Sequence, residues 1–318
     1  MTSGTGRAGL LVILVCLGAG WGITQPLAKI AVSEGYRHFG LIFWQLVISG
    51  ALLAAITVVR GKRLSLQARH LWLYLVIALV GTVLPNAASY EAARHLPAGV
   101  LSVSIATVPM FAFPMALMMG NDHFQWSRLF GVVFGLIGVG LLIGPEASLP
   151  ERAMVAFVPL ALIAPAFYGF EGNYVARWGT GGLDPIQVLL GASVVGAVLA
   201  LPLAVFSGQW IDPRPPWGLP DIALIASSCV HALVYATYVW MVGRAGPVFA
   251  SLVSYLVTGF GVLWSMALLG ERYSGYFWAA VVMMVLGMFL VQPRRSETVA
   301  RAGIAGKSER WTDSQALK

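Results

Sequence analysis

Two short segments, MALMMGND at residues 115–122 and MALLGE at residues 266–271, resemble each other and end in acidic residues 149 positions apart. Other similar pairs are 147 to 149 positions apart: Trp21-Gly22 with Tyr168-Gly169, Lys29 with Arg177, His95 with Arg244, and Gly138 with Gly287. Chance similarity between apolar segments is common, but a nearly constant offset along most of the chain is not. The sequence therefore predicts two copies of one structural unit.

The composition around these segments is typical of a membrane protein. Of the 318 residues, 58% are hydrophobic and only 10% are charged, and the mean hydropathy is +0.79. A soluble domain carries about 25% charged residues, so the composition argues against an ordinary soluble enzyme. The two cysteines, Cys16 and Cys229, lie in apolar runs and predict neither a disulfide framework nor a metal site.

Ten apolar stretches approach the length of about 20 residues that a membrane-spanning helix needs. They lie at 9–32, 40–59, 71–92, 97–119, 126–144, 154–177, 185–206, 220–242, 247–269 and 274–291. None alternates with a period of two residues, which disfavours a transmembrane barrel. Helices remain the way to satisfy the backbone in lipid.

Each copy of the repeat holds five of these stretches, an odd number, so the second copy enters the membrane from the opposite side. We therefore predict an all-α membrane protein whose ten transmembrane helices form two inverted five-helix repeats. The repeats are expected at 9–144 and 154–291, between a short cytoplasmic segment at 1–8 and a disordered cytoplasmic tail at 292–318. Alternating-access transporters use this symmetry and place the substrate near the midplane.

Basic residues predict the orientation of the chain. With both termini in the cytoplasm, 14 Lys and Arg residues fall in inside segments and 5 in outside loops, and Lys29 lies within the first helix. This bias follows the positive-inside rule, so the net charge of +7 indicates orientation and not a nucleic-acid partner. The run after Arg7 is too long for a signal peptide and is expected to remain as a helix. The predicted location is the inner membrane, with multiple passes and both termini cytoplasmic.

Several short motifs in this order resemble the EamA-like branch of the drug/metabolite transporter superfamily. They are Trp21-Gly22 with Lys29, Tyr90-x-Ala92-Ala93 with Pro97-Ala98-Gly99, Pro109, and Leu269-Gly270-Glu271-Arg272. The resemblance covers about residues 9–292. It implies a ten-helix carrier of small metabolites, with a central cavity lined by helices 1, 3, 4, 6, 8 and 9. The sequence departs from the family pattern at Asp122, where glutamate is usual, and at Gln45, where arginine is frequent.

Ionisable residues inside the spans are the first candidate site residues, because a charge in the membrane is costly and usually faces an interior or a cavity. Glu171 lies near the middle of the sixth helix and His231 at the centre of the eighth, with Tyr235 one turn further on the same face. These three could form a hydrogen-bonded substrate or proton site, or a purely structural network. Lys29 is either an interface anchor or part of the outer mouth of the pathway.

Neutral polar and aromatic side chains complete the predicted pathway. Asn86 and Tyr90 share a face of the third helix, and Gln25 lies beside a proline in the first helix, where Trp21 also lies. Tyr255 belongs to a polar face of the ninth helix. Amide groups suit the orientation of a polar metabolite, whereas aromatic residues in spans more often serve packing.

The glycine-rich fifth helix contains Gly131-x-x-x-Gly135 and Gly140-x-x-x-Gly144, spacings that permit close helix contact. Internal packing, for instance against the tenth helix, is the simpler interpretation, and a homodimer seam is the alternative.

The sequence as a whole predicts a secondary active transporter that moves small organic metabolites, amino acids or related compounds among them, by alternating access. No phosphate-binding loop of the Gly-x-x-x-x-Gly-Lys-Ser/Thr type occurs, so primary pumping is disfavoured. The alternatives are an intramembrane enzyme, for which no catalytic motif is found, and a non-transporting membrane subunit. The expected partners are a small-molecule substrate and the lipid bilayer. No cofactor and no metal site are predicted.

Overall fold

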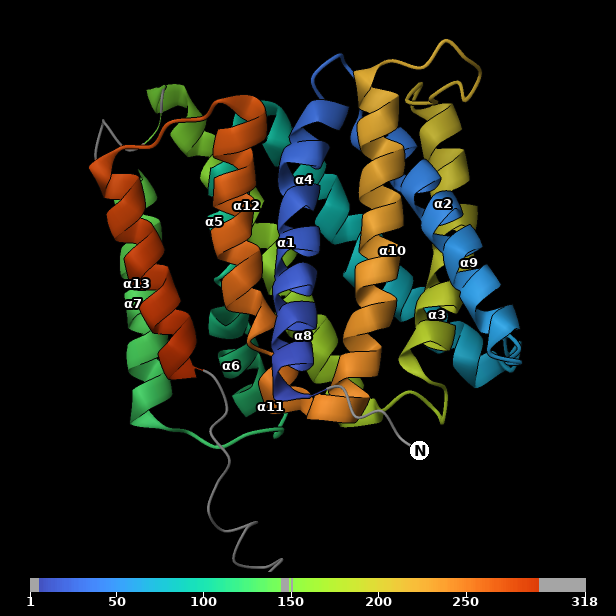
Figure 1. Ribbon diagram of the computed structural model, residues 1–318, viewed down its shortest axis with the longest axis horizontal. Coiled ribbons are helices and arrows are strands. Elements are labelled where there is room, and N and C mark those ends of the chain that lie inside the picture. The colour runs from blue at the N-terminus through green and yellow to red at the C-terminus, as the bar shows by residue number, and fades with distance from the viewer. Residues whose placement is uncertain (1–5, 144–148, 150, 292–318) are drawn as a thin grey trace, which may run out of the picture.

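The computed structural model describes residues 6–143, 149 and 151–291, and these residues form helices and connecting loops (Figure 1). The predicted segments at 1–8 and 292–318 lie mostly or wholly outside the described residues. The first repeat consists of α1 (Arg7–Ala31), α2 (His38–Val59), α3 (Ala68–Ala78), η1 (Leu79–Val83), α4 (Leu84–His95), α5 (Ala98–Ile105), α6 (Val108–Met118) and α7 (Trp126–Ile143). The second consists of η2 (Arg152–Phe157), α8 (Val158–Trp178), α9 (Pro185–Phe206), α10 (Leu219–Ala245), α11 (Pro247–Ala250), α12 (Val253–Leu269) and α13 (Gly275–Val291).

Ten apolar helical segments correspond to the ten predicted spans within the described ranges. Eight of them are long and apolar enough to cross a membrane, where α3 with η1 and α4, α5 with α6, and η2 with α8 each count as one continuous span. The remaining two, α12 and α13, are apolar but shorter, with 17 residues each. The chain is therefore a multi-pass membrane protein, as its composition predicts.

The two repeats run in opposite directions through the bundle. Figure 1 shows α1 beginning at the lower end and α8 beginning at the upper end. The helix contacts follow the same symmetry. α1 of the first repeat packs on α10 and α12 of the second, and α8 packs on their counterparts α4 and α6. The counterpart pairs α2–α9 and α7–α13 also pack on each other. This arrangement confirms the predicted inversion.

Two predicted helices are interrupted where a proline removes a backbone donor. The stretch predicted at 71–92 contains the π-helical turn η1 directly before Pro85, and the stretch predicted at 97–119 breaks at residues 106–107, before Pro109. Proline cannot donate to the carbonyl four residues earlier, so the chain near it widens or ends the helix. Pro26, in contrast, lies within a helix that continues past it.

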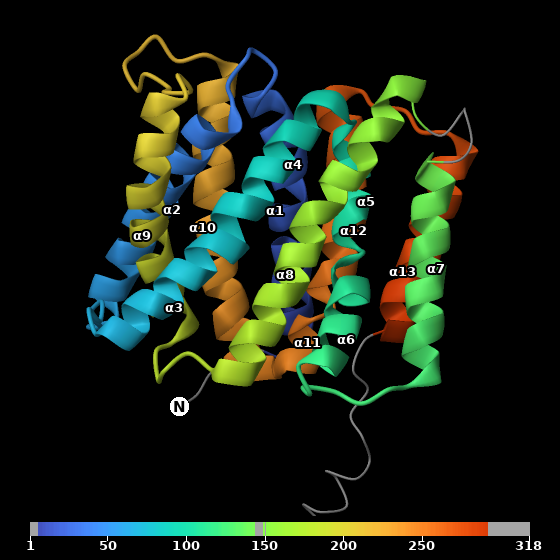
Figure 2. The same cartoon turned by 180° about the vertical axis from the view of Figure 1, so that it is seen from behind.

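Glycines let α7 and α13 pack closely at one edge of the bundle, where both views show them side by side (Figure 2). A Cβ built on Gly131 would lie 2.6 Å from the carbonyl oxygen of Gly287, and one on Gly138 would lie 2.6 Å from Met284 Cγ. Only a residue without a side chain fits at this distance. The glycine-rich fifth helix thus packs internally on the tenth.

At the lower end of the bundle, ion pairs and hydrogen bonds connect the end of α2 to the start of α9. The carboxylate of Asp184, the N-cap of α9, accepts hydrogen bonds from Lys62 Nζ at 2.5 Å and from the backbone N–H of Gln187 at 3.0 Å. Arg60 lies 3.3 Å from the same carboxylate. Burial would raise the pKa of Asp184, but these partners hold it below its ordinary value.

Candidate functional site

Glu171 lies in the middle part of the bundle, on α8, with its carboxylate against the π-helical turn η1. A Cβ built on Gly81 of that turn would lie 2.6 Å from Oε1 and 2.9 Å from Oε2 of Glu171. The glycine therefore leaves the space that the carboxylate occupies. Among the described residues, no hydrogen bond or ion pair to Glu171 is found, and its side chain keeps part of its surface accessible. Such a group is costly in a membrane unless it faces a wet cavity or a ligand.

Aromatic side chains from α1 and α10 form one wall beside Glu171. The ring of Trp21 lies 5.3 Å from that of Tyr238, 6.3 Å from that of His231 and 6.4 Å from that of Tyr235, measured between centroids. These separations are within the range of favourable aromatic contacts. The hydroxyl of Tyr235 lies within electrostatic range of the Glu171 carboxylate. We call these four rings the aromatic wall.

Polar side chains from α2, α4 and α8 form a second wall. Gln45 Oε1 accepts hydrogen bonds from Asn86 Nδ2 and from the Tyr90 hydroxyl, both at 3.0 Å. The hydroxyl of Tyr168 donates to Asn86 Oδ1 at 3.2 Å. Tyr168 is one turn before Glu171 on the same helix and also lies within reach of its charge. We call these four side chains the amide wall.

The two walls are related by the repeat. Trp21 corresponds to Tyr168 at an offset of 147 residues, and Asn86 corresponds to Tyr235 at an offset of 149. Each pair takes one residue from each repeat. The repeat symmetry therefore relates the pair Trp21–Tyr235 to the pair Tyr168–Asn86. The symmetric scaffold places both pairs around one centre, but one pair makes ring contacts and the other a hydrogen bond.

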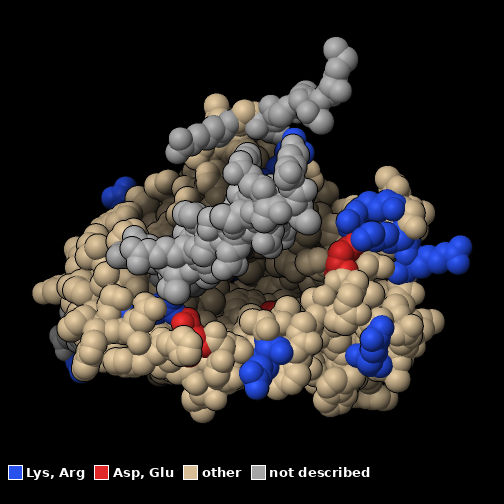
Figure 3. Space-filling model, turned by 90° about the horizontal axis from the view of Figure 1, so that it is seen from below, with Lys and Arg blue, Asp and Glu red and all other residues tan. Residues whose placement is uncertain are grey.

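The lower face of the bundle is hollowed at its centre (Figure 3). Glu171, Trp21, His231 and Tyr235 all keep partial accessibility although they lie well inside the helices. Glu171 is seven residues from the lower end of α8, a rise of about 10 Å. These positions are consistent with a site that is reached from the lower face.

At the upper end, several contacts converge on the turn between α4 and α5. The carboxylate of Glu271 accepts hydrogen bonds from the backbone N–H groups of Ala98 at 2.7 Å and Gly99 at 3.1 Å. The hydroxyl of Tyr273 donates to the same carboxylate. Burial and Glu271 together raise the pKa of Tyr273. Because Glu271 belongs to the second repeat and α5 to the first, this contact joins the two repeats at the upper end.

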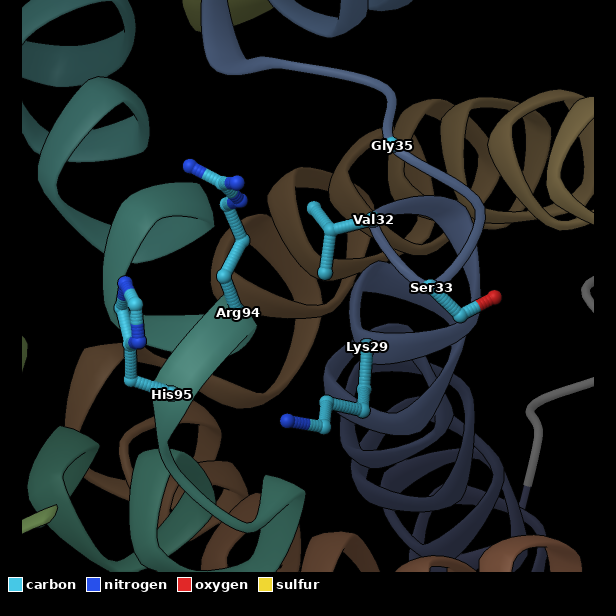
Figure 4. Close-up of a pocket in the computed structure, with 6 residues that line it drawn as sticks. All are labelled: Lys29, Val32, Ser33, Gly35, Arg94 and His95. Carbon is cyan, nitrogen blue, oxygen red and sulfur yellow. The ribbon is translucent and has the colours of Figure 1, made fainter.

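Lys29 contacts the same turn and also lines an upper pocket. Its Nζ donates to the backbone carbonyl of Leu96 at 2.9 Å. The pocket, of about 430 Å³, is lined by Lys29, Val32, Ser33, Gly35, Arg94 and His95 (Figure 4). Arg94 pairs with Glu91 at 3.1 Å, and His95 lies 3.4 Å from the same carboxylate.

The predicted pathway residues thus lie in three places. Glu171, His231, Tyr235 and Trp21 gather at the centre, yet no hydrogen bond joins Glu171 to His231 or Tyr235 among the described residues. Asn86 and Tyr90 belong to the amide wall, and Lys29 to the upper end. Gln25 lies one turn above Trp21 on α1 and is half-buried.

Tyr255 lies on the polar face of α12 and packs against the main hydrophobic core. Its hydroxyl is buried and has no hydrogen-bond partner within the described part of the chain.

Sequence reasoning did not assign Gln45, Tyr168, Tyr238 and Gly81 to the site. Tyr168 carried a signal, because it is the repeat counterpart of Trp21. Gln45 was marked only by its departure from the family pattern. Gly81 carried none, because its role depends on which side chain faces it from another helix.

Comparisons with known proteins place the chain in a family. A relative named "Uncharacterized inner membrane transporter YedA", from Escherichia coli (strain K12), is 23% identical over 282 residues, covering 85% of this chain and 86% of that protein. "Uncharacterized transporter YoaV" from Bacillus subtilis (strain 168) is 21% identical, covering 85% and 92%. One solved crystal structure shares the fold, with a TM-score of 0.60 at 17% identity, covering 90% of this chain and 97% of that one. The model of the EamA-like transporter family matches residues 7–144 and 156–292, and the chain therefore belongs to this family of membrane transporters.

Proposed function

We propose that this protein is a secondary active transporter that moves small organic metabolites across the inner membrane by alternating access. One observation carries the proposal: symmetry-related pairs of side chains, Trp21–Tyr235 and Tyr168–Asn86, lie inside the bundle together with Glu171, a carboxylate that has no partner among the described residues, while Glu271 joins the two repeats at the upper end. Transporters built from inverted repeats bind their substrate at such a central place, and exchange of the two repeat conformations moves the opening to the other side. The family and the names of the relatives favour a carrier over an intramembrane enzyme.

The state described here is then inward-open. The proposal assigns the lower end, where α1 begins, to the cytoplasm, because the basic residues gather in the lower loops. Both termini are cytoplasmic in this orientation. The contacts of Glu271 and Lys29 hold the outer end closed, and the hollow of the lower face leads to Glu171.

The orientation is tested by labelling single cysteines in intact cells, in a variant that lacks Cys16 and Cys229. A cysteine at Leu66, in the lower loop, should be inaccessible to an impermeant thiol reagent. A cysteine at Asp212, in the upper loop, should react. Labelling at Leu66 but not at Asp212 would reverse the orientation.

Alternating access is tested by locking the outer end. In the same cysteine-free background, cysteines at Gly99 and Tyr273 are joined by a short reducible bifunctional reagent, since these two residues touch across the closure. Proteoliposomes are then assayed for uptake of radiolabelled amino acids and amines. Cross-linking should abolish uptake, and reduction should restore it.

Each single-cysteine variant, treated in the same way, serves as the control. Uptake that persists after complete cross-linking would contradict alternation at this end of the molecule. Uptake that is absent from the untreated protein for every solute would reject a carrier of these classes.

A further inference from the structure

We infer that the central site takes protonated organic amines with an aromatic or apolar body: the carboxylate of Glu171 binds the ammonium group, and the aromatic wall holds the body. The inference rests on the proposed function, because it names the substrate class of the same site. Three independent features carry it, namely the charge balance of the site, the composition of the aromatic wall and the fit of the carboxylate against η1.

The charge balance favours a cation. Glu171 has neither an ion-pair nor a hydrogen-bond partner among the described residues. Lys29 and Arg94, by contrast, lie at the upper end with partners of their own. Arg60 and Lys62 pair with Asp184 at the lower end. An unpaired carboxylate deep in a membrane protein attracts a positive charge and repels a negative one. A ligand that supplies an ammonium group offsets the cost of placing the carboxylate there.

The aromatic wall supports the same class of ligand. Tryptophan and tyrosine rings attract cations to their faces and pack against apolar or aromatic bodies. The wall contains three such rings: the rings of Tyr235 and Tyr238 lie 6.4 Å and 5.3 Å from the ring of Trp21, measured between centroids. Tyr235, which belongs to the wall, lies within electrostatic range of Glu171. Rings next to an acidic group thus offer both of the contacts that an arylalkylamine can make.

The position of the Glu171 carboxylate is restricted by the neighbouring backbone. Gly81 lies against the carboxylate on one side, with the built Cβ at 2.6 Å from Oε1 and 2.9 Å from Cδ. The backbone of η1 therefore limits the movement of the carboxylate on that side. In the amide wall, Gln45 Oε1 already accepts two hydrogen bonds and Asn86 Oδ1 accepts one. The carboxylate of Glu171, by contrast, accepts no hydrogen bond from any described residue.

The test uses three probes that share an indole body and differ in charge: tryptamine, tryptophol and indole-3-acetate. Their binding to the purified, detergent-solubilised full chain is measured by isothermal titration calorimetry at neutral pH. We expect tryptamine to bind at least tenfold more tightly than tryptophol, and indole-3-acetate to bind most weakly. Phenethylamine, phenethyl alcohol and phenylacetate repeat the series on a smaller body.

Variants assign the preference to residues. Glu171→Gln should reduce the affinity for tryptamine to that for tryptophol and leave tryptophol unchanged. Trp21→Ala should weaken the binding of both tryptamine and tryptophol, by at least fivefold. Glu34→Gln, which removes an exposed carboxylate from the upper loop, is the control for net charge and should leave the series unaltered. If Glu171→Gln does not fold, Glu171→Asp, which shortens the side chain and keeps the charge, should retain the amine preference at lower affinity.

Several results would overturn the inference. One is an amine preference that persists in Glu171→Gln, and another is indole-3-acetate as the tightest ligand. A third is the absence of binding for all six probes by a protein that takes up other solutes in proteoliposomes. In that last case the amine class is wrong and the carrier function stands, so the two proposals fail separately.

Discussion

The substitution Gly81→Ala tests whether the position of the Glu171 carboxylate matters, because it adds one methyl group against one side of that carboxylate. The built Cβ lies 2.6 Å from Oε1, and ordinary van der Waals contact begins at 3.4 Å. The carboxylate must therefore move by about 0.8 Å, which is possible because it is the end of a flexible side chain. The backbone conformation does not require glycine, since Gly81 has no positive φ.

The expected loss of affinity follows from Coulomb's law. With an effective dielectric constant of about 20, a sideways shift that lengthens the carboxylate–ammonium distance from about 4 Å to about 4.8 Å lowers their attraction from about 4.2 to about 3.5 kcal/mol. A difference of about 0.7 kcal/mol weakens amine binding about threefold. The free energy of unfolding should not fall, because alanine is favoured over glycine in a helix by up to about 1 kcal/mol.

The assay is calorimetric binding of tryptamine, together with thermal melting of the same preparations. Gly172→Ala is the matched control: it lies beside Glu171 on α8, and a Cβ there meets nothing within 4 Å. In a double-mutant cycle, Gly81→Ala should have no further effect once Glu171→Gln is present. Equal affinities of Gly81→Ala and the wild type would refute the reasoning, as would an equal loss in Gly172→Ala.

Three further substitutions test the ends and the edge of the bundle. Glu271→Gln keeps only one of two carboxylate oxygens, so the contacts at the outer end should lose about 1–2 kcal/mol of stabilisation. The measurement is the rate at which an impermeant thiol reagent labels the outer pathway, which should rise. Unchanged labelling would assign the closure to other contacts. Asp184→Asn keeps an N-cap acceptor but removes the ion pairs with Lys62 and Arg60, so it should lower the free energy of unfolding by up to about 1 kcal/mol at neutral pH. Because the folded pKa of Asp184 is depressed, its contribution is present above the unfolded pKa of about 3.9 and is lost as the pH falls below it, so the melting curves of variant and wild type should converge there. Gly138→Ala should destabilise the protein by about 1–3 kcal/mol through overpacking against Met284, whereas Gly140→Ala, which meets nothing within 4 Å, should not; equal melting temperatures would show that α7 and α13 adjust at no cost.

Much of the fold could be predicted from the sequence because it depends on local quantities. Apolar runs of sufficient length predict helices in lipid, and an odd number of them in each repeat predicts the inversion. The interruptions at η1 and at residues 106–107 were not predicted, because a proline in a membrane helix has several outcomes. Pro26 is accommodated within a continuing helix, whereas Pro85 follows a π-helical turn. Which outcome occurs depends on what packs against the helix, as Glu171 packs against Gly81.

The site was predictable only in part, for a related reason. Helical periodicity indicates which residues share a face of one helix, as it did for Asn86 and Tyr90, but it does not indicate which helices meet. Gln45 on α2 completes the amide wall through contacts 41 and 45 residues away in sequence. A direct bond between Glu171 and His231 was a reasonable hypothesis from their depth in the membrane. In the structure, His231 packs against Trp21.

The difference between the two walls bears on how a symmetric carrier recognises an asymmetric solute. The inverted repeat gives two similar halves, and the exchange of their conformations provides a route to both sides of the membrane. Identical halves would offer a substrate two identical surfaces, with no preference for its orientation. Here Tyr235 and Asn86 occupy equivalent positions, but one contributes a ring and the other an amide. Glu171 breaks the symmetry in charge as well, because the position in α1 that corresponds to it at an offset of 147 is the neutral Thr24. The symmetry of the scaffold thus accounts for the exchange between the two conformations. The residues that break this symmetry account for the selection of the substrate.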